Sequence, residues 1–225
     1  MNESFSEWAE VNQPFELKYQ KCYNYRDFST WSTQWNSIFT NFGLDKDYFN
    51  NKVLADIGCG SRPALSYFNK TNTKHCLEPL LDEFLEIEKH AKIKFPGKTN
   101  WARRKDKPHS VVRNWFTEEP FILHSVPYET SIPELINNVD FILCWNVLDH
   151  GYDWRQGINN IIDYLKPGGL LLLGTDYEAH KYHLGIDNPS ELEEIIKTNF
   201  NLKKAYKHNE KVMWSRDYMV LAEKI

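Results

Sequence analysis

A glycine-containing turn, directly after an apolar segment, is the part of this sequence best suited to hold a ligand. Residues 53–55 are apolar, Asp56, Gly58 and Gly60 follow them, and a helix is expected to start just after the turn. Glycines allow the backbone to approach a bound molecule closely. Pro63 replaces the third glycine of the dinucleotide-binding pattern, and Asp56 places a negative charge where a pyrophosphate would lie. The turn therefore favours a zwitterionic or cationic ligand.

An acidic residue further along the chain has the spacing of a ribose contact. Glu78 follows a second apolar segment, 20 positions after Gly58. In dinucleotide folds, an acid at about this distance hydrogen-bonds the ribose hydroxyls. The turn and the acid together predict a site for a nucleoside without phosphates.

Two groups of histidines could take a proton from an acceptor molecule. Asp149 and His150 follow one apolar segment, and His180 and His183 follow the next. An unperturbed histidine has a pKa of ~6.5, which suits a general base near neutral pH. We expect His150 as the first catalytic candidate, with Asp149 and His183 as further ones. The alternative is that Asp149 caps a turn and the histidines only pack or lie in solvent. A metal bound by His150, His180, His183 and an acid is a lesser alternative; because no spacing here is diagnostic of a metal site, none is predicted.

The segments that would position these residues alternate between strand and helix patterns. Apolar segments predict five strands, at residues 52–56, 74–77, 121–124, 139–144 and 170–174. A helical pattern separates the fourth from the fifth, and Asn188 and Pro189 signal the start of another helix over 189–199. Residues 202–208 and 217–221 form a predicted antiparallel hairpin. This order predicts an α/β fold with a doubly wound, seven-stranded, mostly parallel sheet.

Two segments fall outside this alternation. Residues 1–50 carry many aromatic side chains at helical spacing, and we expect them to form a helical cap on a domain at 51–225. Within that domain a basic insertion is expected at about 89–118. Its part at 89–113 has nine Lys or Arg and one acidic residue, so it could contact an anion.

Composition excludes several classes of protein. The 225 residues include 41% hydrophobic residues and have a net charge of −4, which does not fit a protein that binds nucleic acid over its whole surface. No apolar run approaches the ~20 residues of a membrane span, and the start lacks an export signal, so a cytoplasmic protein without membrane contact is expected. The four cysteines stand singly, which indicates neither a disulfide framework nor a zinc knuckle.

Over roughly residues 50–225 the motifs resemble the class I S-adenosylmethionine-dependent methyltransferases. Residues 56–61 are similar to the family's first motif, which holds the methionine part of the cofactor, and Glu78 is similar to its ribose acid. Residues 126–128 resemble the loop that flanks the adenine. Residues 146–150 resemble the end of the fourth strand, which faces the methyl group, and 165–169 resemble the turn before the fifth strand.

The resemblance implies a Rossmann-like fold, S-adenosylmethionine as cofactor and a specific set of contacts. The implied cofactor-binding residues are Asp56, Gly58, Cys59, Gly60, Ser61, Glu78, Pro79, Val126, Pro127 and Asn146. Caps in this family often close over the cofactor, and Arg26 could then pair with its carboxylate.

The function expected from these observations is methyl transfer to a small-molecule acceptor. A hydroxyl of a sugar, a sugar nucleotide or a secondary metabolite is the first choice, and the acceptor could be anionic. One alternative is an RNA or protein methyltransferase that uses the basic insertion, although nucleic acid is the less favoured acceptor. Another is a cofactor-binding partner protein without turnover. The sequence leaves the oligomeric state open.

Overall fold

The computed structural model describes residues 5–23, 28–60, 63–68, 73–81, 83, 121–179, 183–207 and 216–225. Its longer helices are α1 (Phe5–Tyr23), α2 (Phe28–Asn41), α4 (Trp154–Tyr164) and α5 (Pro189–Asn199). Short 3₁₀ turns form at η1 (Ala64–Tyr67), η3 (Pro133–Leu135) and η4 (Leu148–His150). The strands are β1 (Val53–Ile57), β2 (Thr73–Leu77), β3 (Ile122–His124), β4 (Val139–Trp145), β5 (Leu165–Thr175), β6 (Phe200–Lys207) and β7 (Tyr218–Lys224).

The strands form one seven-stranded sheet in the order β3-β2-β1-β4-β5-β7-β6. Strands β1 to β5 pair in parallel, whereas β7 pairs antiparallel with both β5 and β6. The prediction of a Rossmann-like, mostly parallel sheet with a C-terminal antiparallel hairpin is confirmed.

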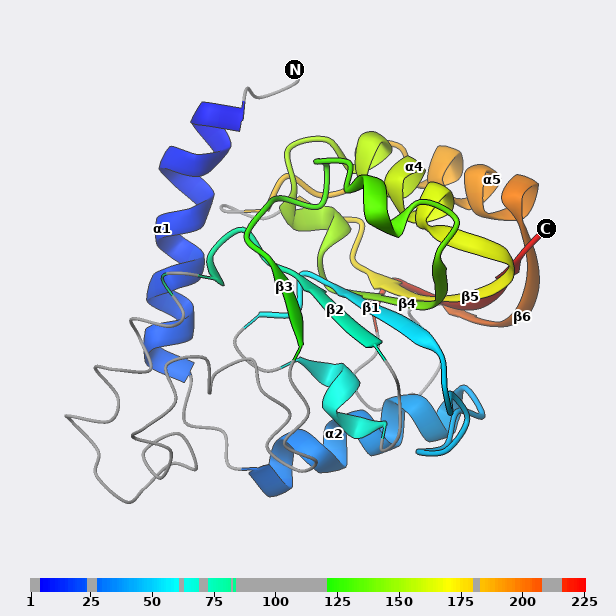
Figure 1. The fold of residues 1–225 in the computed structure, drawn as a ribbon. Coiled ribbons are helices and arrows are strands. Elements are labelled where there is room, and N and C mark those ends of the chain that lie inside the picture. The colour runs from blue at the N-terminus through cyan, green and yellow to red at the C-terminus, as the bar shows by residue number, and fades with distance from the viewer. Residues whose placement is uncertain are drawn as a thin grey trace.

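Helices cover both faces of the sheet, as Figure 1 shows with α4 and α5 on one side and α2 on the other. Successive side chains of a strand point to opposite faces. Ile142 of β4 therefore packs in the cluster that contains Ile158 of α4, while Leu143 packs in the cluster that contains Phe39 of α2. Because both faces are covered, the central strands are apolar almost throughout.

The aromatic side chains of α2 belong to the main core. Phe39 and Phe42 are buried, and their rings contact those of Phe68 and Trp145 respectively. The helix expected directly after the glycine turn is only the 3₁₀ turn η1, and α2 packs against it. Part of that face of the sheet is therefore covered by a helix that precedes β1 in the chain.

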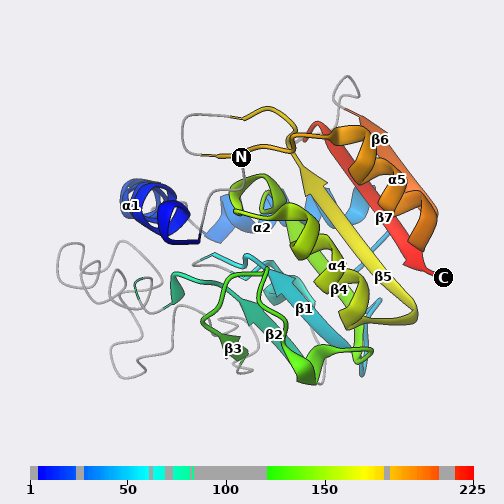
Figure 2. The same ribbon diagram turned by 90° about the horizontal axis from the view of Figure 1, so that it is seen from above.

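The other N-terminal helix, α1, stands to one side of the sheet, apart from the layer of α4 and α5 (Figures 1 and 2). The division of the chain at residue 50 remains a prediction. None of the described helices is both long and apolar enough to cross a membrane.

Strand boundaries differ from the predicted ones mainly at β5. It begins at Leu165, five residues earlier than expected, because Leu165 already pairs with Val139 of β4. The register then shifts before Phe141 meets Leu170, so the turn-forming residues between them are accommodated as an irregularity in the ladder.

Candidate active site

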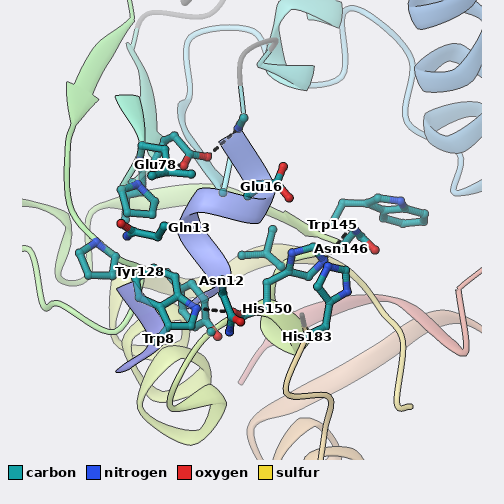
Figure 3. Close-up of a pocket in the computed structure, with 18 of the residues that line it drawn as sticks. Trp8, Asn12, Gln13, Glu16, Glu78, Tyr128, Trp145, Asn146, His150 and His183 are labelled. Carbon is teal, nitrogen blue, oxygen red and sulfur yellow. Dashed lines mark hydrogen bonds between the residues drawn. The ribbon is translucent and has the colours of Figure 1, made fainter. Parts of the chain in front are cut away.

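A pocket of about 560 Å³ lies where β1, β2 and β4 end, and α1 forms one of its walls. Five residues of α1 line it: Trp8, Asn12, Gln13, Phe15 and Glu16. Figure 3 shows Glu78 and His183 at opposite ends of the pocket, with Glu16 projecting between them. The volume falls in the range of about 300–1,000 Å³ that is usual for small-molecule and cofactor sites.

The glycine turn after β1 forms part of the floor. The N–H groups of Gly58 and Cys59 donate to the carbonyl of Leu77, at 2.8 and 3.3 Å, which ties the turn to the end of β2. Gly58 and Gly60 have φ angles of 64° and 57°, a conformation that favours glycine. Both residues line the pocket.

The two glycines are required for different reasons. A Cβ atom on Gly58 would lie 2.4 Å from Cγ2 of Val147, so the missing side chain makes room for protein rather than for a ligand. A Cβ on Gly60 would meet no atom within 4 Å. Gly60 is therefore the position where a side chain would extend into open space at the pocket.

Three of the predicted cofactor contacts lie behind the pocket wall. The carboxylate of Asp56 is buried and accepts a hydrogen bond from the Ala64 N–H at 2.8 Å; burial raises its pKa to about 7. The side chain of Cys59 belongs to the core, and Val126 packs against the core from the other side of the sheet. Their positions suit residues that hold the wall in place.

Glu78 lines the pocket and fastens the glycine turn to the start of the next segment. Its Oε2 accepts from the Gly60 N–H and its Oε1 from the Leu80 N–H, both at 3.0 Å. Burial raises the pKa of this carboxyl to about 7. Pro79 and Pro127 also line the pocket near this end.

At the other end, Asn146 follows β4 in a conformation unusual for a residue other than glycine. Its φ angle is 60°, and its N–H donates to the carbonyl of Gly174 at 2.6 Å. Asparagine tolerates this left-handed region better than most residues do. The Nδ2 group of Asn146 lies 3.1 Å from Nε2 of His150. Because an amide nitrogen can only donate, Nε2 of His150 accepts.

Asp149 lies beneath two histidines that face the pocket. Its side chain is 1% exposed, and Thr175 Oγ1 donates to its Oδ1 at 3.2 Å. Its Oδ2 lies 3.4 Å from Nε2 of His150 and 3.6 Å from Nδ1 of His183. The two imidazole rings are 3.6 Å apart, centre to centre. Asp149, His150 and His183, which were predicted from separate segments, thus form one cluster.

Burial determines the charge states in this cluster. It raises the pKa of Asp149, although His183 opposes this shift. It lowers the pKa of His150 to about 4, and the charge of Arg216 acts in the same direction. His150 is consequently neutral at physiological pH, in agreement with its acceptor role toward Asn146.

The residues that α1 contributes to the pocket are not among those predicted from the sequence. Trp8, Asn12 and Glu16 are four positions apart and share one helical face, which is a signal that the sequence contains. The indole N–H of Trp8 donates to the carbonyl of His150 at 2.6 Å, so α1 is tied directly to the catalytic candidates. Asp176 and Arg216, joined by an ion pair of 2.7 Å, also line the pocket and were not predicted.

Some predictions fall on parts of the chain that the structure does not describe. Arg26, Ser61 and His180 lie outside the described residues, and so does the basic insertion at about 89–118. Their roles remain predictions.

Comparison with known proteins identifies the type of domain. A family model described as "Methyltransferase domain" matches residues 32–200. A search of curated proteins found no match.

Solved structures share the fold at low sequence identity. A 1,6-didemethyltoxoflavin-N1-methyltransferase of Burkholderia thailandensis, with bound 1,6-didemethyltoxoflavin and S-adenosylhomocysteine, has a TM-score of 0.57 and 15% identity over 99% of this chain and 91% of its own. An rRNA methylase of Streptococcus thermophilus has a TM-score of 0.50 and 13% identity over 84% and 94%. A SAM-dependent methyltransferase of Aquifex aeolicus has a TM-score of 0.50 and 14% identity over 85% and 89%.

Proposed function

Since the chain belongs to the class I S-adenosylmethionine-dependent methyltransferases, we propose that it methylates a hydroxyl group of a small-molecule acceptor such as a sugar, a sugar nucleotide or a secondary metabolite. S-adenosylmethionine is the cofactor, and it supplies a methyl group that is already activated on a sulfonium. The work left to the protein is to position the acceptor and exclude water. The cytoplasmic location expected from the sequence is part of this proposal.

The end of the pocket near Glu78 fits the nucleoside part of this cofactor. Each carboxylate oxygen of Glu78 accepts one backbone N–H and retains a further acceptor site for a ribose hydroxyl. Gly60 offers open space beside it, and Pro79 and Pro127 provide apolar walls. Ser61 and Arg26 remain in the proposal as contacts to the methionine part.

The cluster at the opposite end supports the proposal of a hydroxyl acceptor. Asp149, His150 and His183 form a group that can orient a hydroxyl and handle its proton, and the two histidines line the pocket. Methylation of a hydroxyl releases that proton, and because an alcohol is less acidic than a thiol and less nucleophilic than a neutral amine, it gains most from a group that accepts the proton. The arrangement of these three residues is the observation that carries the proposed acceptor class.

The position of α1 favours a small acceptor over a polymer. Five of its residues line the pocket, and Trp8 is buried with a hydrogen bond to His150. A base within RNA, or a side chain within a protein, would have to pass this helix. RNA and protein are therefore the less favoured acceptors, and the experiment below includes both.

Methyl transfer from labelled S-adenosylmethionine to a panel of acceptors tests the proposal. The panel contains sugars, sugar nucleotides, phenols, small amines, total RNA and a protein extract. We expect label in a hydroxyl compound, lost in the His183→Ala variant and retained in Glu10→Gln, which changes an exposed residue of α1. Label only in amines, RNA or protein would contradict the proposed acceptor class.

A further inference from the structure

We propose that Glu16, His150 and His183 form a binding site for a divalent transition-metal ion at the acceptor end of the pocket. Each residue offers one ligand atom, and these atoms all lie within 4.8 Å of one another. They come from three separate elements: α1, the 3₁₀ turn η4 and the segment after β5. The fold, rather than a local sequence motif, brings them together.

The donor set defines the class of metal. Two imidazole nitrogens and one carboxylate oxygen suit Zn²⁺, Fe²⁺, Co²⁺ or Mn²⁺, whereas Mg²⁺ and Ca²⁺ prefer oxygen ligands only. Catalytic zinc sites characteristically use three protein ligands of these types and leave a further position for water or substrate. The three residues therefore fit an ion that keeps an open position.

That open position would face the pocket. Glu16, His150 and His183 are all partly exposed, and all three line the cavity. An ion can thus enter from the pocket and bind an oxygen atom of a molecule held there. A site of this kind differs from a structural metal site, in which protein ligands fill every position.

A buried carboxylate supports the two histidines from behind. Oδ2 of Asp149 lies within 3.6 Å of a ring nitrogen of each histidine and has no hydrogen-bond partner among the described residues. Histidines that bind metals commonly place their second nitrogen against such a carboxylate, which fixes the ring and strengthens the ligand. For His150 that nitrogen is Nε2, so binding of an ion at Nδ1 requires the tautomer that is protonated on Nε2, and the Asn146 amide must then present its oxygen instead of its nitrogen. The unpaired oxygen of Asp149 is the independent observation that points to a positive charge at this position.

The charges around the pocket also favour a cation. Glu16 and Asp176 line it, and Arg216 is the one described Lys or Arg on its wall. The carboxyls of Glu78 and Asp149 have raised pKa values and so contribute less negative charge. Arg216 is already paired with Asp176. An ion beside Glu16 would offset this excess of carboxylates.

The role of the ion in catalysis depends on the proposed function. A hydroxyl bound to a divalent cation loses its proton more readily than a free one. The histidines would then assist the acceptor through the ion rather than as free bases. Binding of the ion itself does not depend on the identity of the acceptor.

Titration of the untagged, chelator-treated protein (residues 1–225) with Co²⁺ and with Zn²⁺, without S-adenosylmethionine, tests the site. We expect one Co²⁺ per chain, with visible absorption bands typical of nitrogen and oxygen ligands, and displacement by Zn²⁺. His183→Ala and Glu16→Gln should each weaken binding at least about tenfold, and Asp149→Asn should weaken it about 10–100-fold without abolishing it.

Two controls separate this inference from the proposed function. Glu10→Gln should bind Co²⁺ as the unchanged protein does, and circular dichroism checks that each variant folds. Binding that is absent, or unaffected by both Glu16→Gln and His183→Ala, would overturn the inference. Full methyl transfer in the presence of a strong chelator would overturn its catalytic part and leave the proposed function intact. Stoichiometric Co²⁺ binding without hydroxyl methylation would support the site and contradict the proposed function.

Discussion

At the scale of single residues, Gly58 and Gly60 belong to one turn but face different surroundings. The space beside Gly58 is filled by Val147, and the space beside Gly60 is open. Both have positive φ angles, so any other residue at either position is strained. Gly58 is therefore needed for packing, whereas a bound cofactor can approach Gly60 closely.

Alanine substitutions should therefore have different effects at the two positions. Gly60→Ala should lower the free energy of unfolding by about 1–3 kcal/mol, from backbone strain alone, and should weaken binding of S-adenosylmethionine. Gly58→Ala should destabilise the protein more, because its Cβ also collides with Val147. Urea unfolding and calorimetric titration measure the two effects. Equal stability losses would show that the Val147 contact is unimportant.

At the scale of elements, α2 contributes to the fold and α1 to the site. Phe39 of α2 is fully buried and contacts the rings of Tyr67 and Phe68. Five buried or partly buried residues of α1 instead line the pocket: Trp8, Asn12, Gln13, Phe15 and Glu16. Mutations in α2 should therefore affect mainly stability, whereas mutations in the pocket-lining residues of α1 should affect mainly ligand binding.

Phe39→Ala should lower the free energy of unfolding by about 3–5 kcal/mol, because it leaves a cavity between α2 and the sheet. Thr33→Ala, at an exposed position of the same helix, serves as the control and should change stability by less than about 0.5 kcal/mol. Denaturant unfolding measures both variants. A small loss for Phe39→Ala would mean that α2 is not part of the cooperative core.

Sequence patterns predicted the elements that depend on local periodicity. The apolar segments predicted the strands in their order along the chain, and Asn188 with Pro189 correctly marked the start of α5. Asp149 with His150, and His183, follow two of these strands, and because the carboxyl ends of parallel strands meet at one edge of a sheet, this position brings them together. Each of these inferences uses a rule that relates nearby residues or the known geometry of parallel sheets.

The contribution of α1 could not be predicted in the same way. Asn12, Gln13 and Glu16 have the polar character of a solvent-facing surface, and only long-range packing turns that surface toward the pocket. The role of Gly58 depends likewise on Val147, which lies far away in the sequence. Contacts of this kind are set by tertiary structure: the four-residue spacing of Trp8, Asn12 and Glu16 indicates a shared helical face but not what that face contacts.

At the scale of the whole molecule, buried ionisable groups make stability depend on pH. Burial raises the pKa values of Asp56, Glu78 and Glu129 to about 7. Each keeps its proton in the folded protein at a pH where the unfolded chain has lost it, so rising pH favours unfolding. His75 and His150, whose pKa values are lowered to about 4, have the opposite effect, but only below the unfolded pKa of histidine, ~6.5.

The free energy of unfolding should therefore fall by about 2 kcal/mol between about pH 6.5 and 8, where the three carboxyls outweigh what remains of the histidine titration. Glu129→Gln should reduce this fall by roughly one third, because an amide oxygen can still accept from Tyr152 and Asp153 but does not titrate. Urea unfolding across this range measures the slope. Stability that rises with pH in this window would contradict the assigned charge states.

Every functional step proposed for this protein depends on binding of S-adenosylmethionine in the pocket beside Gly60 and Glu78, and calorimetric titration measures this binding. S-adenosylmethionine and NAD are titrated separately into the unchanged protein, Glu78→Ala and Glu134→Gln, the last altering an exposed carboxylate. We predict binding of S-adenosylmethionine alone, weakened in Glu78→Ala by about 1.5–3 kcal/mol and unchanged in Glu134→Gln. Equal affinity of all three proteins for S-adenosylmethionine, or binding of NAD instead, would contradict the account.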